Sequence, residues 1–139
     1  MTAQRPELPE LRRRLSEAGE HLCAIRGCAE PDAEFVYKNL RAYVLGKLLL
    51  EDAPESADSL RKLTERSIRN AQRLRERGVS VEEVSPGCGV SSAETKRILL
   101  LLSIQKTLGV RFDGQSAAYM ETVRDLAAEI CRLLRERKE

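Results

Sequence analysis

Apolar residues recur every three or four positions along most of the chain, and this period constrains the fold more than any other feature of the sequence. It places an apolar stripe along one side of a helix. No segment alternates between apolar and polar residues for long enough to predict a strand. Aromatic residues make up only 4% of the chain, so a core of Leu, Val, Ile and Ala is expected. We therefore predict an all-α fold with about five helices.

Residues that cap and break helices set the expected bounds of the first two helices. The first starts near Leu8 and ends before Gly27 and Pro31. Asp32 can cap the second helix, which is expected to continue to Asp52.

The polar segment at residues 51–59 (EDAPESADS) contains a proline and favours a connection. We therefore divide the chain into an N-terminal helical pair, residues 1–57, and a helical bundle, residues 58–139. Three more helices are expected in the bundle, the first near residues 60–78. Thr122 can cap the last one.

The helix between these two follows a loop at residues 78–90. Its start is predicted by Ser91 and Glu94, which have the S-x-x-E spacing of a capping box. Gly109 is well placed to end it. Apolar residues fill positions 98–102 and cover more than one side, so this helix is expected to be buried.

Charge and hydropathy exclude several classes of function. The formal net charge is only +2, which argues against strong nonspecific binding to nucleic acids or membrane surfaces. No apolar run approaches the roughly 20 residues that cross a bilayer. The first ten residues lack the apolar stretch of a secretory signal. A cytoplasmic protein without membrane contact is expected.

Residues that often perform catalysis or bind metals are few. His21 is the single histidine and lies at the polar edge of a helix, where a surface position is expected. Cys23 and Cys28 are five positions apart, which is not the spacing of a zinc pair. Cys88 and Cys131 are expected to be free thiols, as in reduced cytosolic proteins. We predict neither an enzyme nor a metal site.

Residues 81–99 fit part of a helix-turn-helix pattern. In that interpretation Lys96 and Arg97 lie on the second helix and contact DNA. Pro86 and Gly87 would fall inside the first helix, where both are costly. The expected burial of residues 98–102 also leaves no face free for a DNA groove. A small DNA-binding regulator is therefore kept as the alternative function.

A wider window, residues 60–136, resembles the acyl carrier protein family. The family's first helix is followed by a Gly-Val…Glu-Glu-Val stretch, its second ends in an apolar-Gly-apolar-x-apolar signature, and its last opens with Thr-Val-x-Asp-Leu. The matching residues here are 78–79 with 82–84, 108–112 and 122–126. The resemblance implies a carrier-like bundle with a two-helix N-terminal extension.

The resemblance also implies a place for a 4'-phosphopantetheine arm, on a serine at the start of the second family helix. Glu94 stands at that register, and Ser91 and Ser92 lie just before it. Three alternatives follow. Ser92 or Ser91 carries the arm, or the domain docks to partners without an arm, or Cys88 supplies a reactive thiol in a loop before a helix N-terminus.

Three surfaces are candidates for contact with protein partners such as biosynthetic enzymes. Lys96, Arg97 and Lys106 are expected to face partners from the fourth helix, where the family is usually acidic. The N-terminal pair could mediate a homodimer through Phe35, Tyr43 and Leu48. The third helix carries a basic face, which is either solvated or a docking surface for an acidic partner or phosphates. Its residues are Arg61, Lys62, Arg66, Arg69, Arg73, Arg75 and Arg77.

Overall fold

The computed structural model describes residues 7–50, 58–79 and 92–138, and most residues within these ranges are helical. The predicted all-α class is confirmed. Six helices are described: α1 Glu7–Arg26, α2 Ala33–Lys47, α3 Leu60–Glu76, α4 Ala93–Leu108, α5 Gly114–Tyr119 and α6 Val123–Lys138. The short helix α5 lies in what the sequence predicted to be a loop, because six residues are too few to produce a recognisable apolar period.

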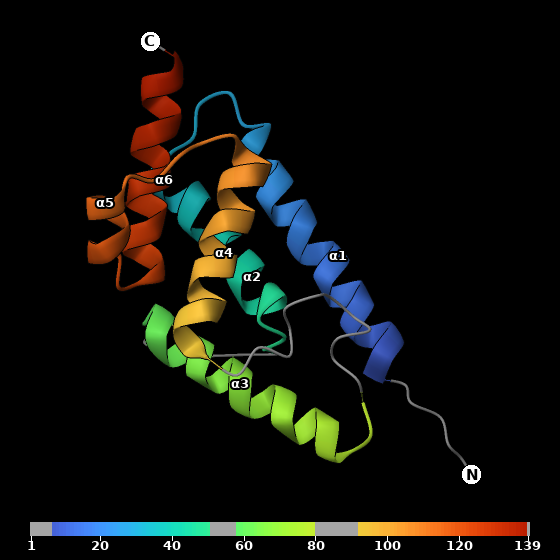
Figure 1. Cartoon of the computed structure of the whole chain (residues 1–139). Coiled ribbons are helices and arrows are strands. Elements are labelled where there is room, and N and C mark those ends of the chain that lie inside the picture. Colours follow the sequence, from blue (N-terminus) through green and yellow to red (C-terminus); the bar gives the residue numbers. More distant parts are fainter. Residues whose placement is uncertain (1–6, 51–57, 80–91, 139) are drawn as a thin grey trace.

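Helix α2 packs against α1 and against α6 (Figure 1). The α1–α2 crossing is close because two small residues meet there. A Cβ atom on Gly46 would lie only 2.7 Å from the Cβ of Ala18. Helix α4 contacts α1 on one side, and α3 runs across the end at which α4 begins.

One main hydrophobic cluster draws on residues from both sides of the expected boundary at 57/58. Leu22 of α1 and Leu40 of α2 share it with Leu63 of α3, Ile104 of α4 and Ile130 of α6. The N-terminal pair therefore packs on the helices that follow it. The boundary itself lies in residues 51–57, outside the described residues.

The second helix ends earlier than expected, at Lys47 instead of near Asp52. Leu49 follows in the left-handed conformation, with φ 59°, and the amide of Leu50 donates to the carbonyl of Leu45. This is a Schellman ending with leucine where glycine is usual. Sequence alone favoured continuation because Leu48, Leu49 and Leu50 are all apolar.

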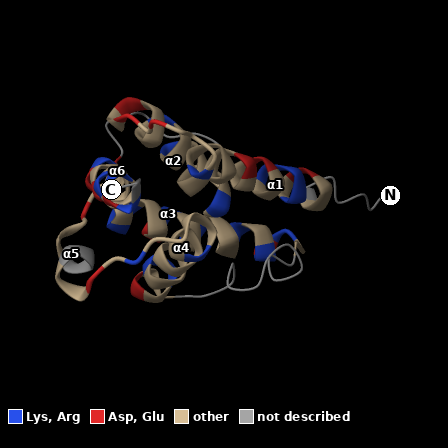
Figure 2. Cartoon of the chain, turned by 90° about the horizontal axis from the view of Figure 1, so that it is seen from above, with Lys and Arg blue, Asp and Glu red and all other residues tan. Residues whose placement is uncertain are grey.

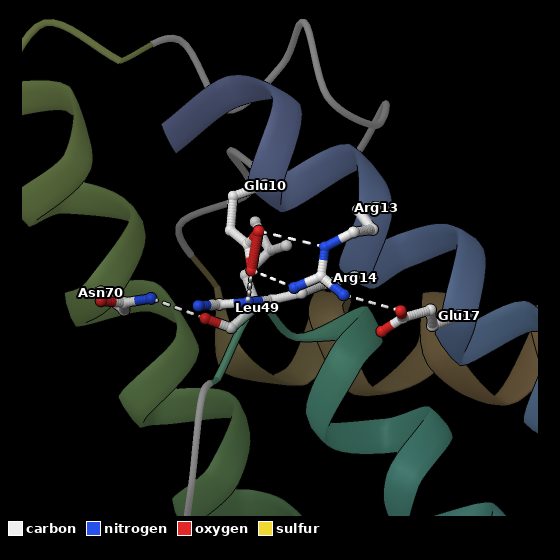
Figure 3. Close-up of polar contacts among 6 residues, drawn as sticks. All are labelled: Glu10, Arg13, Arg14, Glu17, Leu49 and Asn70. Carbon is white, nitrogen blue, oxygen red and sulfur yellow. Dashed lines mark hydrogen bonds and ion pairs between the residues drawn. The ribbon is translucent and has the colours of Figure 1, made fainter. Parts of the chain in front are cut away.

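Helix α3 supplies the polar groups that stabilise this ending. The Asn70 side chain donates to the Leu49 carbonyl at 2.7 Å (Figure 3), and the Ser67 hydroxyl donates to the Leu48 carbonyl at 2.7 Å. Leu49 thus joins α2 to α3 through its backbone, and it packs in a small cluster with Leu11 and Leu74.

Nearby on α1, Arg13 forms ion pairs with Glu10 and Glu17, which lie one turn away in either direction (Figure 3).

Helix ends follow the sequence signals in most places. Asp32 accepts a hydrogen bond from the Phe35 amide and caps α2, as predicted. Thr122 caps α6 and accepts from the Asp125 amide at 3.0 Å, also as predicted. Gly109, at φ 69°, ends α4. The N-terminal cap of α4 is Ser92, one residue beyond the predicted Ser91.

A short antiparallel bridge ties the start of α3 to the start of α6. The Leu60 amide donates to the Glu121 carbonyl, and the Val123 amide donates to the Asp58 carbonyl, both at 2.9 Å. The Asp58 carboxylate also accepts from the Arg124 amide. These bonds fix the direction in which α3 leaves the body of the fold.

Candidate docking surfaces

Ser92 lies at the start of α4 with an exposed side chain. Its hydroxyl oxygen accepts a hydrogen bond from the Thr95 amide at 3.3 Å. This is the ordinary work of an N-terminal cap, and it stabilises a helix by about 1 kcal/mol. The other two predicted reactive residues, Ser91 and Cys88, lie outside the described residues.

A groove of about 980 Å³ lies between α3 and the first turn of α4, and it is lined by Ala93, the residue after Ser92, but not by Ser92 itself. Ala93, Glu94 and Arg97 of α4 form one wall, and the first turns of α3 form the other. Both acidic and basic side chains line it, including Arg61 and Glu65. Its walls therefore carry no single sign of charge, and they do not select between an anionic and a cationic ligand.

Lys96 does not face a partner, which corrects the sequence prediction. Only 6% of the residue is exposed, and its Nζ donates to the Ser67 hydroxyl at 2.7 Å. Ser67 in turn donates to the Leu48 carbonyl, so a buried polar chain links α4, α3 and the end of α2. Lys96 lies inside because four residues separate it from Leu100, which places both on the inner side of α4.

Arg97 is largely withdrawn from the surface as well. Its side chain is 18% exposed, ion-pairs with Glu94 at 3.5 Å and reaches the Met120 carbonyl at 3.4 Å. It connects α4 to the segment before α6. Lys106 is exposed, so it alone of the three predicted partner-facing cations lies on the surface.

The predicted burial of α4 on several sides is wrong. Leu100, Leu101 and Ile104 are buried, whereas Ile98, Leu99 and Leu102 are 46%, 42% and 52% exposed. We call these last three residues the outer face of α4. The five consecutive apolar residues surround the helix at 100° steps, and the core covers only one side of it. Sequence reasoning missed this face because an apolar run does not say which of its residues find a neighbour.

Helix α3 separates its apolar and basic residues cleanly. Leu60, Leu63 and Leu74 are buried, while the opposite side carries cations three or four residues apart. We call these cations the basic stripe; they are Lys62, Arg66, Arg69 and Arg73 of α3 and Arg77 at its C-terminal cap. All are exposed except the half-buried Arg66.

Among the residues of α3 itself, no acidic residue lies between the cations of the basic stripe. At 100° per residue, Glu65 and Glu76 fall to one side of it. Glu65 pairs with Arg61, which lies outside the stripe, at 3.4 Å. With a rise of 1.5 Å per residue, the stripe extends over about 22 Å. Five of the seven predicted cations therefore form a line of positive charge, whereas Arg61 and Arg75 lie outside it.

The predicted dimer face on the N-terminal pair is not available. Tyr43 and Leu48 are 4% and 3% exposed and belong to the main hydrophobic cluster, and Phe35 is half-buried. The Tyr43 hydroxyl shares a hydrogen bond of 2.6 Å with Ser103 of α4. Burial raises the pKa of Tyr43. The side chains of Phe35, Tyr43 and Leu48 therefore pack within the fold, where α2 meets its neighbours.

A second groove, of about 710 Å³, lies where α1, α2 and α4 meet. Its walls include Leu15, Cys23, Lys47 and Thr107. His21 is close in sequence to Cys23 of this groove. It is exposed, and its side chain contacts that of Asn39 at 3.0 Å, in keeping with the predicted surface position. Cys23, Cys28 and Cys131 are free thiols.

The described ranges contain neither a candidate metal centre nor a candidate membrane span. No cluster of three or more His, Cys, Asp or Glu side chains in residues 7–50, 58–79 and 92–138 could hold a metal ion. Over the same part of the chain, no helix has the length and apolar character needed to cross a membrane.

Comparisons with models of protein families, with curated proteins and with solved structures find no match to this chain.

Proposed function

We propose that the protein is a docking module with carrier-like helices, and that it binds an acidic protein partner through the basic stripe of α3. The proposal is for binding rather than catalysis. The observation that carries it is the line of Lys62, Arg66, Arg69 and Arg73 on one side of α3, which Arg77 continues at the C-terminal cap. The whole chain has a net charge of only +2, so the strong positive charge is a local property of the basic stripe.

The basic stripe destabilises its own helix through repulsion between like charges, and exposure to solvent alone gives no reason to retain that repulsion. Arg69 and Arg73, and Lys62 and Arg66, are like charges one helical turn apart, and such pairs destabilise a helix. A partner that neutralises them gains from the repulsion that it relieves. Arginine predominates in the stripe, and its planar guanidinium suits bidentate contact with carboxylates.

The carrier-like part of the proposal rests on the order of the helices. The sequence resemblance assigns the first, second and last helices of the acyl carrier protein family to the parts of the chain that form α3, α4 and α6. That family meets basic partners through acidic helices. A basic stripe in this chain therefore favours partners of the opposite charge, for which complementary potentials speed association and improve specificity.

Binding of poly-glutamate, measured by fluorescence anisotropy at low salt, tests the docking surface. The triple variant Arg66→Glu, Arg69→Glu, Arg73→Glu is expected to bind at least about tenfold more weakly, since several exposed ion pairs are lost together. The matched control is Lys38→Glu, Arg111→Glu, Arg135→Glu, which changes the net charge equally at exposed positions elsewhere. Equal losses in both variants would reject a localised docking surface.

The same titration with duplex DNA tests the alternative function. A regulator of the predicted kind would need Lys96 to contact DNA, but this side chain is buried. We therefore expect weak binding to DNA that does not change on Lys96→Met. If the protein binds DNA tightly and with a steep salt dependence, and the triple variant binds it more weakly, then the partner of the basic stripe is a nucleic acid and not an acidic protein.

A carrier role for Ser92 is the second candidate, because this exposed serine caps α4 and directly precedes Ala93, which lines the 980 Å³ groove. Intact-mass measurement after co-expression with a phosphopantetheinyl transferase tests it. We expect no added 4'-phosphopantetheine, since the hydroxyl already caps the helix. An added arm that disappears on Ser92→Ala would make the protein a carrier. An arm that disappears on Ser91→Ala would place the attachment one residue earlier.

A further inference from the structure

Three of the four exposed large apolar side chains among the described residues lie on the outer face of α4. Ile98, Leu99 and Leu102 are each more than two-fifths exposed. At 100° per residue they lie within about a third of the helix circumference, with Leu102 in the middle. Scattered single apolar residues need no explanation on a protein surface, but three on one face mark a contact site.

The charges at the two ends of this face indicate what covers it. The three apolar residues centre close to position 100. Glu94 lies six residues before this point and Lys106 six residues after it, which is about 9 Å in each direction. Glu94 is 70% exposed although it also pairs with Arg97, and Lys106 is exposed. An acid at one end and a base at the other form a self-complementary pattern under a twofold axis.

We propose that the outer face of α4 pairs with the same face of a second copy, with the two α4 helices antiparallel. Ile98 then lies against Leu102 of the partner subunit, and Leu102 against the partner's Ile98. Glu94 comes within reach of Lys106 of the partner subunit, and the same pair forms again at the other end. The contact is isologous, as in most homodimers, and antiparallel helices also align their dipoles favourably.

The position of α4 leaves room for this arrangement. In Figure 2 the helix lies at one edge of the helical assembly, while α2 lies at the opposite edge. The basic stripe belongs to another helix, so pairing through α4 does not depend on the docking proposal, and either can fail without the other. A dimer of this kind would carry two basic stripes.

Sedimentation equilibrium over a range of concentrations tests the dimer. The wild-type protein is expected to dimerise, and Leu102→Glu is expected to be monomeric because it places a charge in the apolar contact. Its fold should persist, since more than half of Leu102 is exposed, and circular dichroism checks this. Ala128→Glu, at an exposed position of α6, is the control that should still dimerise. A monomeric wild type, or a dimeric Leu102→Glu variant, would overturn the proposal.

A charge exchange tests the antiparallel register. Glu94→Lys and Lys106→Glu each bring like charges together twice, and each should raise the dimer dissociation constant by about tenfold. The double variant Glu94→Lys, Lys106→Glu restores opposite charges across the contact and should recover most of the affinity. Two weakened single variants without recovery in the double variant would refute this register.

Discussion

Helices α3 and α4 have similar lengths and pack against each other, yet they use opposite chemistry on their outer sides. Helix α3 is apolar inside and basic outside, with Leu63 buried and Arg69 exposed. Helix α4 is apolar on both sides, and its first lysine points inward. The contrast indicates that the outward side of α3 suits water or an acidic partner, whereas that of α4 suits another apolar surface.

The largest expected effect compares the two sides of α4. Because they differ in burial, they should contribute differently to the free energy of unfolding. Ile104 is fully buried, so Ile104→Ala should lower the free energy of unfolding by about 3 kcal/mol through lost burial and a residual cavity. Leu102→Ala should change it by less than about 0.5 kcal/mol in the monomer. Urea unfolding at low protein concentration measures both. Similar losses would mean that Leu102 has a neighbour within its own chain.

The buried polar chain between the two helices should have the next largest effect. Ser67→Ala removes the acceptor at 2.7 Å from Lys96 Nζ and the donor to the Leu48 carbonyl. Leaving buried polar groups without these bonds should cost about 2 kcal/mol. Urea unfolding of Ser67→Ala beside Ser16→Ala, an exposed serine on α1, provides the measurement and its control. If the two variants were equally stable, Ser67 would not support Lys96.

Burial of the Tyr43 phenol at the contact between α2 and α4 predicts a pH dependence. Because burial raises the pKa of Tyr43, the folded protein holds the phenol proton more tightly than the unfolded chain does. Stability is then fully present below about pH 10 and falls as the pH rises further. Tyr43→Phe should reduce this alkaline fall, while it costs about 1 kcal/mol near neutral pH through the lost bond.

Thermal unfolding between neutral and alkaline pH measures that slope. Tyr119→Phe is the control, because Tyr119 is 80% exposed and its loss should leave the slope unchanged. Burial also raises the pKa of Tyr37, so part of the fall should remain in the Tyr43→Phe variant. An unchanged slope in Tyr43→Phe would mean that Tyr43 ionises as readily in the folded protein as in the unfolded chain.

The smallest expected effect concerns the outer side of α3. Arg69→Gln removes repulsion with Arg66 and Arg73 and should stabilise the protein by about 0.5 kcal/mol at low salt. The gain should shrink in 1 M salt, where charges are screened over about 3 Å. Arg61→Gln is the matched control on the same helix, since Arg61 has Glu65 as a partner and its loss should give no gain. A stabilised Arg61→Gln with an unchanged Arg69→Gln would contradict repulsion within the stripe.

Much of the fold could be predicted because helix period and caps are local. Asp32, Thr122 and Gly109 act at helix ends as predicted, since each needs only its own backbone neighbours. The early end of α2 could not be predicted in this way. The left-handed Leu49 is held by Asn70 of α3 and by its apolar neighbours in the small cluster, which are distant in sequence.

The candidate sites differ in the same way, because some depend on local sequence and others on contacts between helices. The sequence by itself determined the basic stripe, because the spacing of five cations on a helix follows from helical geometry alone. Only the tertiary structure decided the roles within α4, where Lys96 turned inward and Leu102 stayed outside. Burial depends on which side of a helix meets the other helices, and when a helix is apolar all round, its own residues do not encode that choice.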